Sequence, residues 1–98
     1  MCCCCGRIIT SSGQRIEVNG SHEHTFANPE GIVFHIACFA RVQGCLFAGE
    51  PTGDWTWFRG YLWSVAYCAG CGSHLGWSYS SGDGVFYGLV LRSISIVT

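Results

Sequence analysis

Lysine is absent from the 98-residue sequence, and charged residues of either sign make up only 11% of it. The five arginines are scattered along the chain and nearly balanced by six carboxylates, which leaves a formal net charge of −1 at pH 7. A protein that binds nucleic acid through its phosphates concentrates basic side chains in one place. The composition therefore predicts that nucleic acid is not a partner of this protein.

Long apolar runs are also missing, because no stretch approaches the roughly 20 residues that a membrane-spanning helix needs. The first residues, Met-Cys-Cys-Cys-Cys-Gly, lack the basic and then apolar segments of a secretory signal peptide. We therefore expect a cytoplasmic protein that does not enter a membrane. Its length predicts a single domain over residues 1–98.

Helical periodicity is hard to find in the sequence, whereas alternation of apolar and polar residues is common. The alternating segments predict strands over Gln14 to Val18, Ile32 to Phe39, Tyr61 to Cys68 and Val85 to Val97, the last with a break near Gly88. Turn-forming residues cluster at 28–31, 51–54 and 80–84. Fourteen glycines in such short segments favour hairpins over helices, so the sequence predicts an all-β antiparallel fold.

Eight cysteines are the most informative feature of the composition, and four of them form two C-x2-C pairs. Cys2 and Cys5 precede Gly6, and Cys68 and Cys71 precede Gly72. Such knuckles supply two thiolates each to a tetrahedral zinc ion, although disulfides or redox pairs would fit a secreted chain. Without a signal peptide we favour one structural Zn²⁺ per chain, which ties the N-terminus to the second half of the sequence. Four thiolates leave no open position for catalysis.

The other cysteines and histidines give weaker signals. Cys3 and Cys4 lack the spacing of the flanking pair and are expected to be bystanders, while Cys38 and Cys45 are interpreted as small core residues. A second metal site at residues 22–24 (His-Glu-His) is the alternative to a solvated loop, which we favour. We expect His74 to orient the knuckle loop through a hydrogen bond.

Three of the four tryptophans flank the second knuckle: Trp57 and Trp63 before it, and Trp77 after it. Any one of them would usually be part of the core. Three rings in glycine-broken segments around one rigid point instead suggest a cage, which suits a small compact ligand or a quaternary cation.

The order of motifs resembles the thalidomide-binding (CULT) domain family of cereblon, and most closely its free-standing bacterial members. The matching motifs are the Cys2-x-x-Cys5 knuckle, Asn28-Pro29-x-Gly31, Trp57-Phe58-x-Gly60-Tyr61-x-Trp63, Cys68-x-x-Cys71-x-Ser73-His74-x-Gly76-Trp77 and Phe86-Tyr87-Gly88-Leu89. The resemblance implies a β-tent, in which two antiparallel sheets join at the structural zinc site. It also implies a binding module that holds a cyclic imide, such as a glutarimide or a thalidomide-type ligand, and that is not an enzyme. The protease-like and adaptor-binding regions of full cereblon have no counterpart here, so we expect no ubiquitin-ligase adaptor as a partner.

The resemblance also assigns ligand-binding residues. Trp57, Trp63 and Trp77 match the cage walls, Tyr79 matches the aromatic residue that closes the cage, and Asn28 matches the polar residue at the rim. The family binds the imide partly through a backbone carbonyl at the position of Trp55 and a backbone N–H at that of Trp57. Trp55 stands where histidine or phenylalanine is usual, and Glu30 replaces a histidine common in animal members.

Two rival functions follow from the same residues. A methionine sulfoxide reductase of the B type shares a zinc-stapled β fold but needs a nucleophilic thiol, and no cysteine follows Cys71. Cys38 with His35, or Cys45, would be an improvised substitute, and Cys38 and His35 would face opposite sides of a continuous strand because three residues separate them. A reader of methylated ammonium groups would need a carboxylate beside the cage, which Glu30 or Asp54 would supply. The plainest alternative is an interaction module whose tryptophans are only core.

Overall fold

The computed structural model describes residues 1–95, and six antiparallel strands account for most of its regular structure. The strands are β1 (Glu23–Ala27), β2 (Val33–Phe39), β3 (Cys45–Thr52), β4 (Leu62–Cys68), β5 (His74–Ser81) and β6 (Gly84–Val90). Two single-turn 3-10 helices, η1 (Ser12–Gln14) and η2 (Leu91–Ser93), lie near the two ends. The predicted all-β antiparallel fold is confirmed. No helix among the described residues is long and apolar enough to span a membrane.

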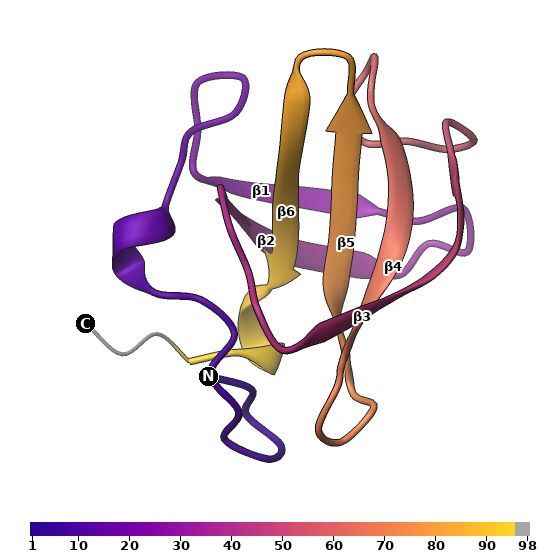
Figure 1. Ribbon diagram of the computed structural model, residues 1–98. Coiled ribbons are helices and arrows are strands. Elements are labelled where there is room, and N and C mark those ends of the chain that lie inside the picture. Colours follow the sequence, from indigo (N-terminus) through magenta and orange to yellow (C-terminus); the bar gives the residue numbers. More distant parts are fainter. Residues whose placement is uncertain (96–98) are drawn as a thin grey trace.

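The strands form one hydrogen-bonded sheet in the order β1-β2-β6-β5-β4-β3. In Figure 1, β1 and β2 run across β4, β5 and β6 and lie behind them. The two expected sheets are therefore two arms of one bent sheet, joined where Ile36 to Phe39 of β2 pair with Tyr87 to Val90 of β6. Side chains between the arms are buried from both sides.

Two predicted strands, 32–39 and 61–68, match β2 and β4 to within a residue at their start. The predicted strand over 85–97 corresponds to β6, which continues through Gly88 and turns into η2 after Val90; its last two residues lie outside the described part. The predicted strand over 14–18 is wrong. Only isolated antiparallel bridges occur there, from Arg15 to Phe39 and from Val18 to Ser21, because the pairing with the end of β2 is limited to the single bridge at Arg15.

Two buried clusters form the core. The first is mainly aliphatic and includes Cys2 and Cys68, together with Ile9, Ala37, Phe39, Leu75, Leu89 and Ile94. The second is mainly aromatic and contains Ile36, Cys38, Phe58, Tyr79, Phe86 and Val90, with Trp57, Trp63 and Trp77 packed against it. Each cluster underlies one of the two sites described next.

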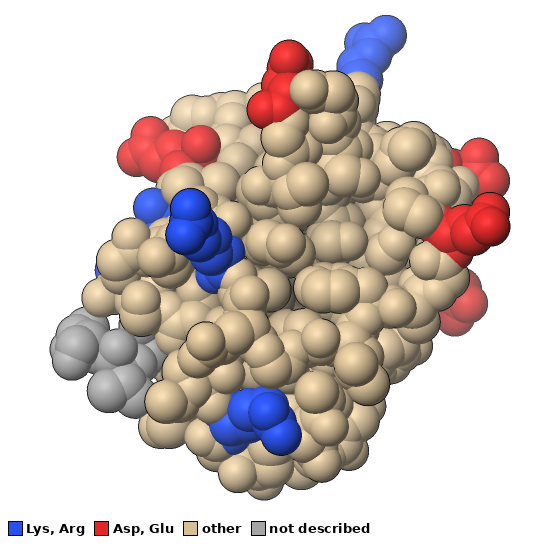
Figure 2. Space-filling view, viewed as in Figure 1, with Lys and Arg blue, Asp and Glu red and all other residues tan. Residues whose placement is uncertain are grey.

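Charged side chains are sparse on the surface as well as in the sequence. On the face shown in Figure 2, arginines are separated by uncharged surface and form no continuous patch. This arrangement fits the even spread of the five arginines along the sequence.

Candidate functional site

The two C-x2-C segments form turns of the same design. The N–H of Gly6 donates to the carbonyl of Cys2 at 2.9 Å, and that of Gly72 donates to the carbonyl of Cys68 at 2.8 Å. Both glycines have φ of 78°, a conformation that side-chain-bearing residues avoid. The second turn joins β4 to β5, and the first is tied to the C-terminal segment by a bridge between Cys2 and Ile94.

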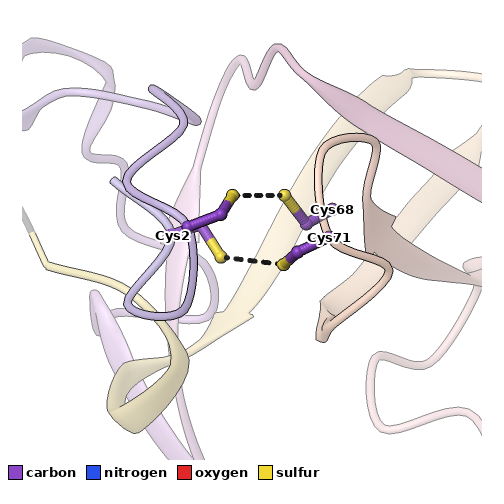
Figure 3. A group of neighbouring side chains, drawn as sticks. Cys2, Cys68 and Cys71 are labelled. Atoms are coloured by element: carbon purple, nitrogen blue, oxygen red, sulfur yellow. Dashed lines mark hydrogen bonds between the residues drawn. The ribbon is translucent and has the colours of Figure 1, made fainter.

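The four cysteine sulfurs converge between these turns. Cys2, Cys5, Cys68 and Cys71 have their Sγ atoms within 4.8 Å of one another. The Cys2 and Cys71 sulfurs are 3.7 Å apart and the Cys5 and Cys68 sulfurs 3.5 Å apart, and Figure 3 shows Cys2 facing Cys68 and Cys71 across the gap. A tetrahedral ion with Zn–S bonds of about 2.3 Å places its sulfurs about 3.8 Å apart. The four cysteines are therefore close enough to bind one metal ion, with separations near those that zinc requires.

Nearby hydrogen-bond donors stabilise the thiolate forms in the second turn. The Ser73 hydroxyl lies 3.1 Å from the Cys71 sulfur, and with the Ser73 backbone N–H it lowers the pKa of the Cys71 thiol to about 6. Burial by itself would raise the pKa of the Cys68 thiol. Hydrogen bonds from the backbone N–H groups of Cys71 and Gly70 stabilise the thiolate, and the net effect is a lowered pKa. The Gly70 N–H lies 3.4 Å from the Cys68 sulfur. Thiolates are the form that binds metal.

The remaining cysteines do not join this cluster. Cys3 and Cys4 are exposed in the first turn, and Cys38 is fully buried in the aromatic core. Cys45 is half-buried beside the aliphatic core, and its thiol donates to the Gln43 carbonyl at 3.5 Å. The cysteine cluster is the only group of three or more potential metal ligands within residues 1–95.

The histidine-containing segment at residues 22–24 is not a solvated loop, because Glu23 and His24 begin β1. His22 and His24 hydrogen-bond to backbone carbonyls, at 3.0 Å each. The ring of His74 hydrogen-bonds to the Gly76 carbonyl of its own strand at 3.1 Å and packs edge-on against Trp77. Its hydrogen-bond partner therefore lies in β5 and not in the knuckle loop.

A cavity of about 270 Å³ opens over the aromatic core, toward the ends of β4 and β5 remote from the cysteine cluster. It is lined by Asn28, Pro29, Trp55, Trp57, Trp63, Val65, Trp77 and Tyr79. All six residues expected to bind a ligand thus border one cavity. Its volume lies just below the usual 300–1,000 Å³ of drug-sized pockets, which favours a single-ring ligand.

The tryptophan walls are fixed by the strand register and by other rings. Trp63 of β4 pairs directly with Tyr79 of β5, and Val65 pairs with Trp77, so these four share one face of the sheet. The ring of Trp57 meets that of Trp77 edge-on at 4.8 Å and stacks on Phe26 of β1 at 5.0 Å. The cage therefore spans both arms of the sheet.

Several polar atoms around the cavity are already engaged. The indole N–H of Trp57 donates to the Ala27 carbonyl at 3.3 Å, and that of Trp63 donates to the Asp54 carbonyl at 2.7 Å. The carboxamide oxygen of Asn28 accepts hydrogen bonds from the backbone N–H groups of Glu30 and Ile32, at 3.0 and 2.9 Å. These bonds hold the walls in place, and of the two polar atoms of the Asn28 side chain the amide nitrogen remains for a ligand.

Two backbone groups beside the cavity are free. The carbonyl of Trp55 and the N–H of Trp57 make no hydrogen bond within residues 1–95. Trp55 adopts φ of 60°, unusual for a bulky residue, and its side chain is 76% exposed at the cavity mouth. A free acceptor and a free donor therefore lie two residues apart on one loop.

Sequence reasoning missed several residues that shape the cavity. Pro29 and Val65 line it, and Phe34 packs edge-on against Trp77 at 5.1 Å. The sequence could have identified Val65, because it lies two residues after Trp63 on a predicted strand and so shares its face. The sequence could not have identified Phe34, because its contact with Trp77 depends on how the two arms of the sheet meet.

Within residues 1–95, no cysteine lines the cavity. Burial raises the pKa of the Cys38 thiol to about 11, and His35, three residues away on β2, is exposed. Neither Glu30 nor Asp54 is among the lining residues. The cavity is thus aromatic and uncharged.

No protein-family model matches the chain. Among curated proteins, cereblon of Drosophila melanogaster is 32% identical over 78 residues, which cover 72% of this chain. Cereblon of Gallus gallus and of Xenopus tropicalis are 30% and 32% identical over 56 residues, or 57% of this chain. The aligned part spans only 12–13% of the length of these relatives. The similarity confirms the predicted resemblance to cereblon.

Proposed function

We propose that this cereblon-like chain is a zinc-stapled binding module that holds a cyclic imide in the cavity between Trp57, Trp63 and Trp77, and that it is not an enzyme. The observation that carries the proposal is the pairing of an uncharged aromatic cavity with two free backbone groups at its edge. An imide presents one N–H between two carbonyls on a compact ring. The Trp55 carbonyl accepts that N–H, and the Trp57 N–H donates to one imide carbonyl.

The balance of forces favours such a neutral ligand. Aromatic walls bury the ring, and each imide polar atom needs a partner once it leaves water. The backbone supplies partners for the imide N–H and for one carbonyl, the Asn28 amide nitrogen is free for the other carbonyl, and no charge is required. Because a single-ring ligand has few atoms to bury, we expect roughly micromolar affinity.

The rival functions lack the groups that they need at this site. An ammonium reader depends on a carboxylate beside its rings, and neither Glu30 nor Asp54 lines the cavity. A sulfoxide reductase depends on a thiolate nucleophile, and the high pKa of buried Cys38 keeps that thiol protonated at neutral pH. Roles of full-length cereblon in protein assemblies are not part of the proposal, because the chain covers so little of those proteins.

A fluorescence titration tests the choice between imide and cation. Trp57 and Trp77 would report occupancy directly, because ligand contact changes the environment of their rings. We expect saturable binding of glutarimide and no response to trimethyl-lysine at the same concentrations. Binding of trimethyl-lysine without glutarimide would replace the proposal with the cation reader.

A substitution in the cage places the binding site. Trp63→Ala removes one wall and should weaken glutarimide binding by about 2–4 kcal/mol, which moves a micromolar ligand beyond easy detection. Metal content, measured by elemental analysis, should stay at one zinc per chain. As a control, Val85→Ser changes an exposed residue that does not line the cavity and should bind like the wild type. Unchanged binding in Trp63→Ala would place the ligand elsewhere.

A further inference from the structure

A second cavity, of about 300 Å³, opens where β6 ends beside β2. The pairing of these two strands begins at Ile36 and Val90, because the chain leaves β6 after Val90 and enters η2, the yellow coil below β6 in Figure 1. Residues 33–35 of β2 are therefore paired on one edge only, with β1. The gap on their other edge is the cavity, which shares no residue with the tryptophan cavity; its lining consists of Val33, Phe34, His35, Val90, Leu91 and Arg92.

The backbone of this part of β2 directs N–H groups toward the second cavity. The N–H of Cys38 donates to the carbonyl of His22, just before β1, at 2.9 Å, so it points to the β1 edge. Consecutive residues of a strand direct their N–H groups to alternate edges. Val33 and His35 are an odd number of residues from Cys38, so their N–H groups point to the opposite edge. There the cavity lies, and no strand within residues 1–95 pairs with them.

Arg92 supplies a positive charge at the same cavity. Its guanidinium carbon lies 6.0 Å from the centroid of the Phe34 ring, within the range of a cation–π contact. No aspartate or glutamate is among the lining residues, and Arg92 forms no ion pair within residues 1–95. The contact with the ring leaves the forked N–H donors of the guanidinium for a planar anion, and a carboxylate matches that fork with two parallel hydrogen bonds.

We infer that this second cavity binds a small organic monocarboxylate, whose carboxylate pairs with Arg92 and accepts a backbone N–H of β2 while its apolar part packs against Val33 and Leu91. One guanidinium matches one negative charge. The other lining side chains are apolar apart from His35, whose Nδ1 is hydrogen-bonded to the Thr25 hydroxyl at 2.8 Å. A neutral molecule of the same shape forgoes the charge-assisted bonds that favour the anion. The inference does not depend on imide binding, because the two cavities have separate linings.

An NMR titration of ¹⁵N-labelled protein with benzoate and benzamide tests this inference, because the two molecules share a ring and differ in charge. Benzoate should bind with a dissociation constant of roughly 1 mM, since it has few atoms to bury. Its largest chemical-shift changes should fall on the amides of residues 33–35 and 90–92. At the same ionic strength benzamide should bind at least tenfold more weakly, because it cannot form the ion pair.

Two arginine substitutions separate the site from a general effect of charge. Arg92→Gln removes the guanidinium at the cavity and should weaken benzoate binding about tenfold or more. Arg59→Gln is the matched control, because Arg59 is also exposed, carries the same charge and does not line this cavity. Its affinity for benzoate should stay within about twofold of the wild type.

Three results would overturn the inference. The first is equal affinity for benzoate and benzamide in the wild type, a comparison that holds whether or not Arg92→Gln folds. The second is wild-type affinity for benzoate in a folded Arg92→Gln protein. The third is the absence of shifts at residues 33–35 and 90–92 at about 20 mM benzoate, well above the expected dissociation constant. Benzoate-induced shifts confined to the tryptophan cavity belong to this third result and leave the proposal of imide binding intact.

Discussion

The cysteine cluster and the aromatic cavity occupy opposite ends of the β4–β5 pair, and they are assembled in different ways. At one end, Cys68 and Cys71 lie in the connecting turn, so half of the metal site comes from four consecutive residues. At the other end, Trp63 pairs with Tyr79 and Val65 with Trp77 across the strands, and the remaining walls come from the β1–β2 turn and the loop before β4. Each half of the metal site is local in sequence, although the two halves come from distant parts of the chain, whereas the cavity exists only once the sheet has formed.

The two sites also differ in what their failure would do to the fold. The metal cluster joins the N-terminal segment, the β4–β5 turn and the aliphatic core, which includes Cys2 and Cys68. The walls formed by Trp57, Trp63 and Trp77 pack on the aromatic core from outside and remain partly exposed. We therefore expect damage at the metal site to unfold the domain and damage at the cavity to remove only binding.

The largest effect should come from the metal ligands. Cys68→Ser or Cys71→Ser should abolish folded protein, because metal binding and folding are coupled in small domains. The apparent free energy of zinc binding is about 10–16 kcal/mol in zinc-finger peptides. Circular dichroism and elemental analysis measure the two losses together. Cys3→Ser alters an exposed thiol outside the cluster and should be nearly neutral. A folded, metal-free Cys68→Ser protein would contradict the expectation that damage at the metal site unfolds the domain.

A moderate effect should come from Gly88, which connects the aromatic core to the cavity. Its added Cβ would lie 2.9 Å from the Ile36 side chain and 3.0 Å from the Tyr79 ring. Gly88→Ala should therefore lower the free energy of unfolding by about 1–3 kcal/mol and displace Tyr79, with weaker imide binding and intact metal content. Gly82→Ala, where nothing lies within 4 Å, is the control in denaturant titrations. Equal stability of the two variants would mean that the core yields freely around Tyr79.

The smallest effect should come from Trp55 at the cavity mouth. Its φ of 60° is unfavourable for a bulky residue, and asparagine tolerates this conformation better. Trp55→Asn should raise the free energy of unfolding by up to about 1 kcal/mol, measured by denaturant titration, since the exposed indole contributes little packing. A loss of stability would show that the indole packs against the rim in solution.

The contrast between local and assembled sites also explains what the sequence could predict. The spacing of Cys2, Cys5, Cys68 and Cys71 carries the metal chemistry by itself, and the structure brings all four together. Strands with one buried and one solvated face, such as β4, were recognisable from alternation. β3 was missed because Gly49 and Pro51 read as turn residues and almost every side chain along this edge strand is exposed.

Other features depend on three-dimensional contacts that no short pattern encodes. β5 was missed because Gly76 and its serines weaken the strand signal, although Trp77 and Tyr79 were identified individually. The use of the Asn28 oxygen inside its own turn emerges only from the folded arrangement. The joining of the expected two sheets through β2 and β6 likewise follows from long-range pairing.

Methylation of the imide nitrogen tests the central claim most directly. In the proposed complex the imide N–H donates to the Trp55 carbonyl, so a methyl group removes the donor and inserts bulk against the acceptor. Calorimetry at matched concentrations should show roughly micromolar binding of glutarimide and no detectable binding of N-methylglutarimide. Equal affinity for the two compounds would contradict the proposed recognition, even if both occupy the tryptophan cage.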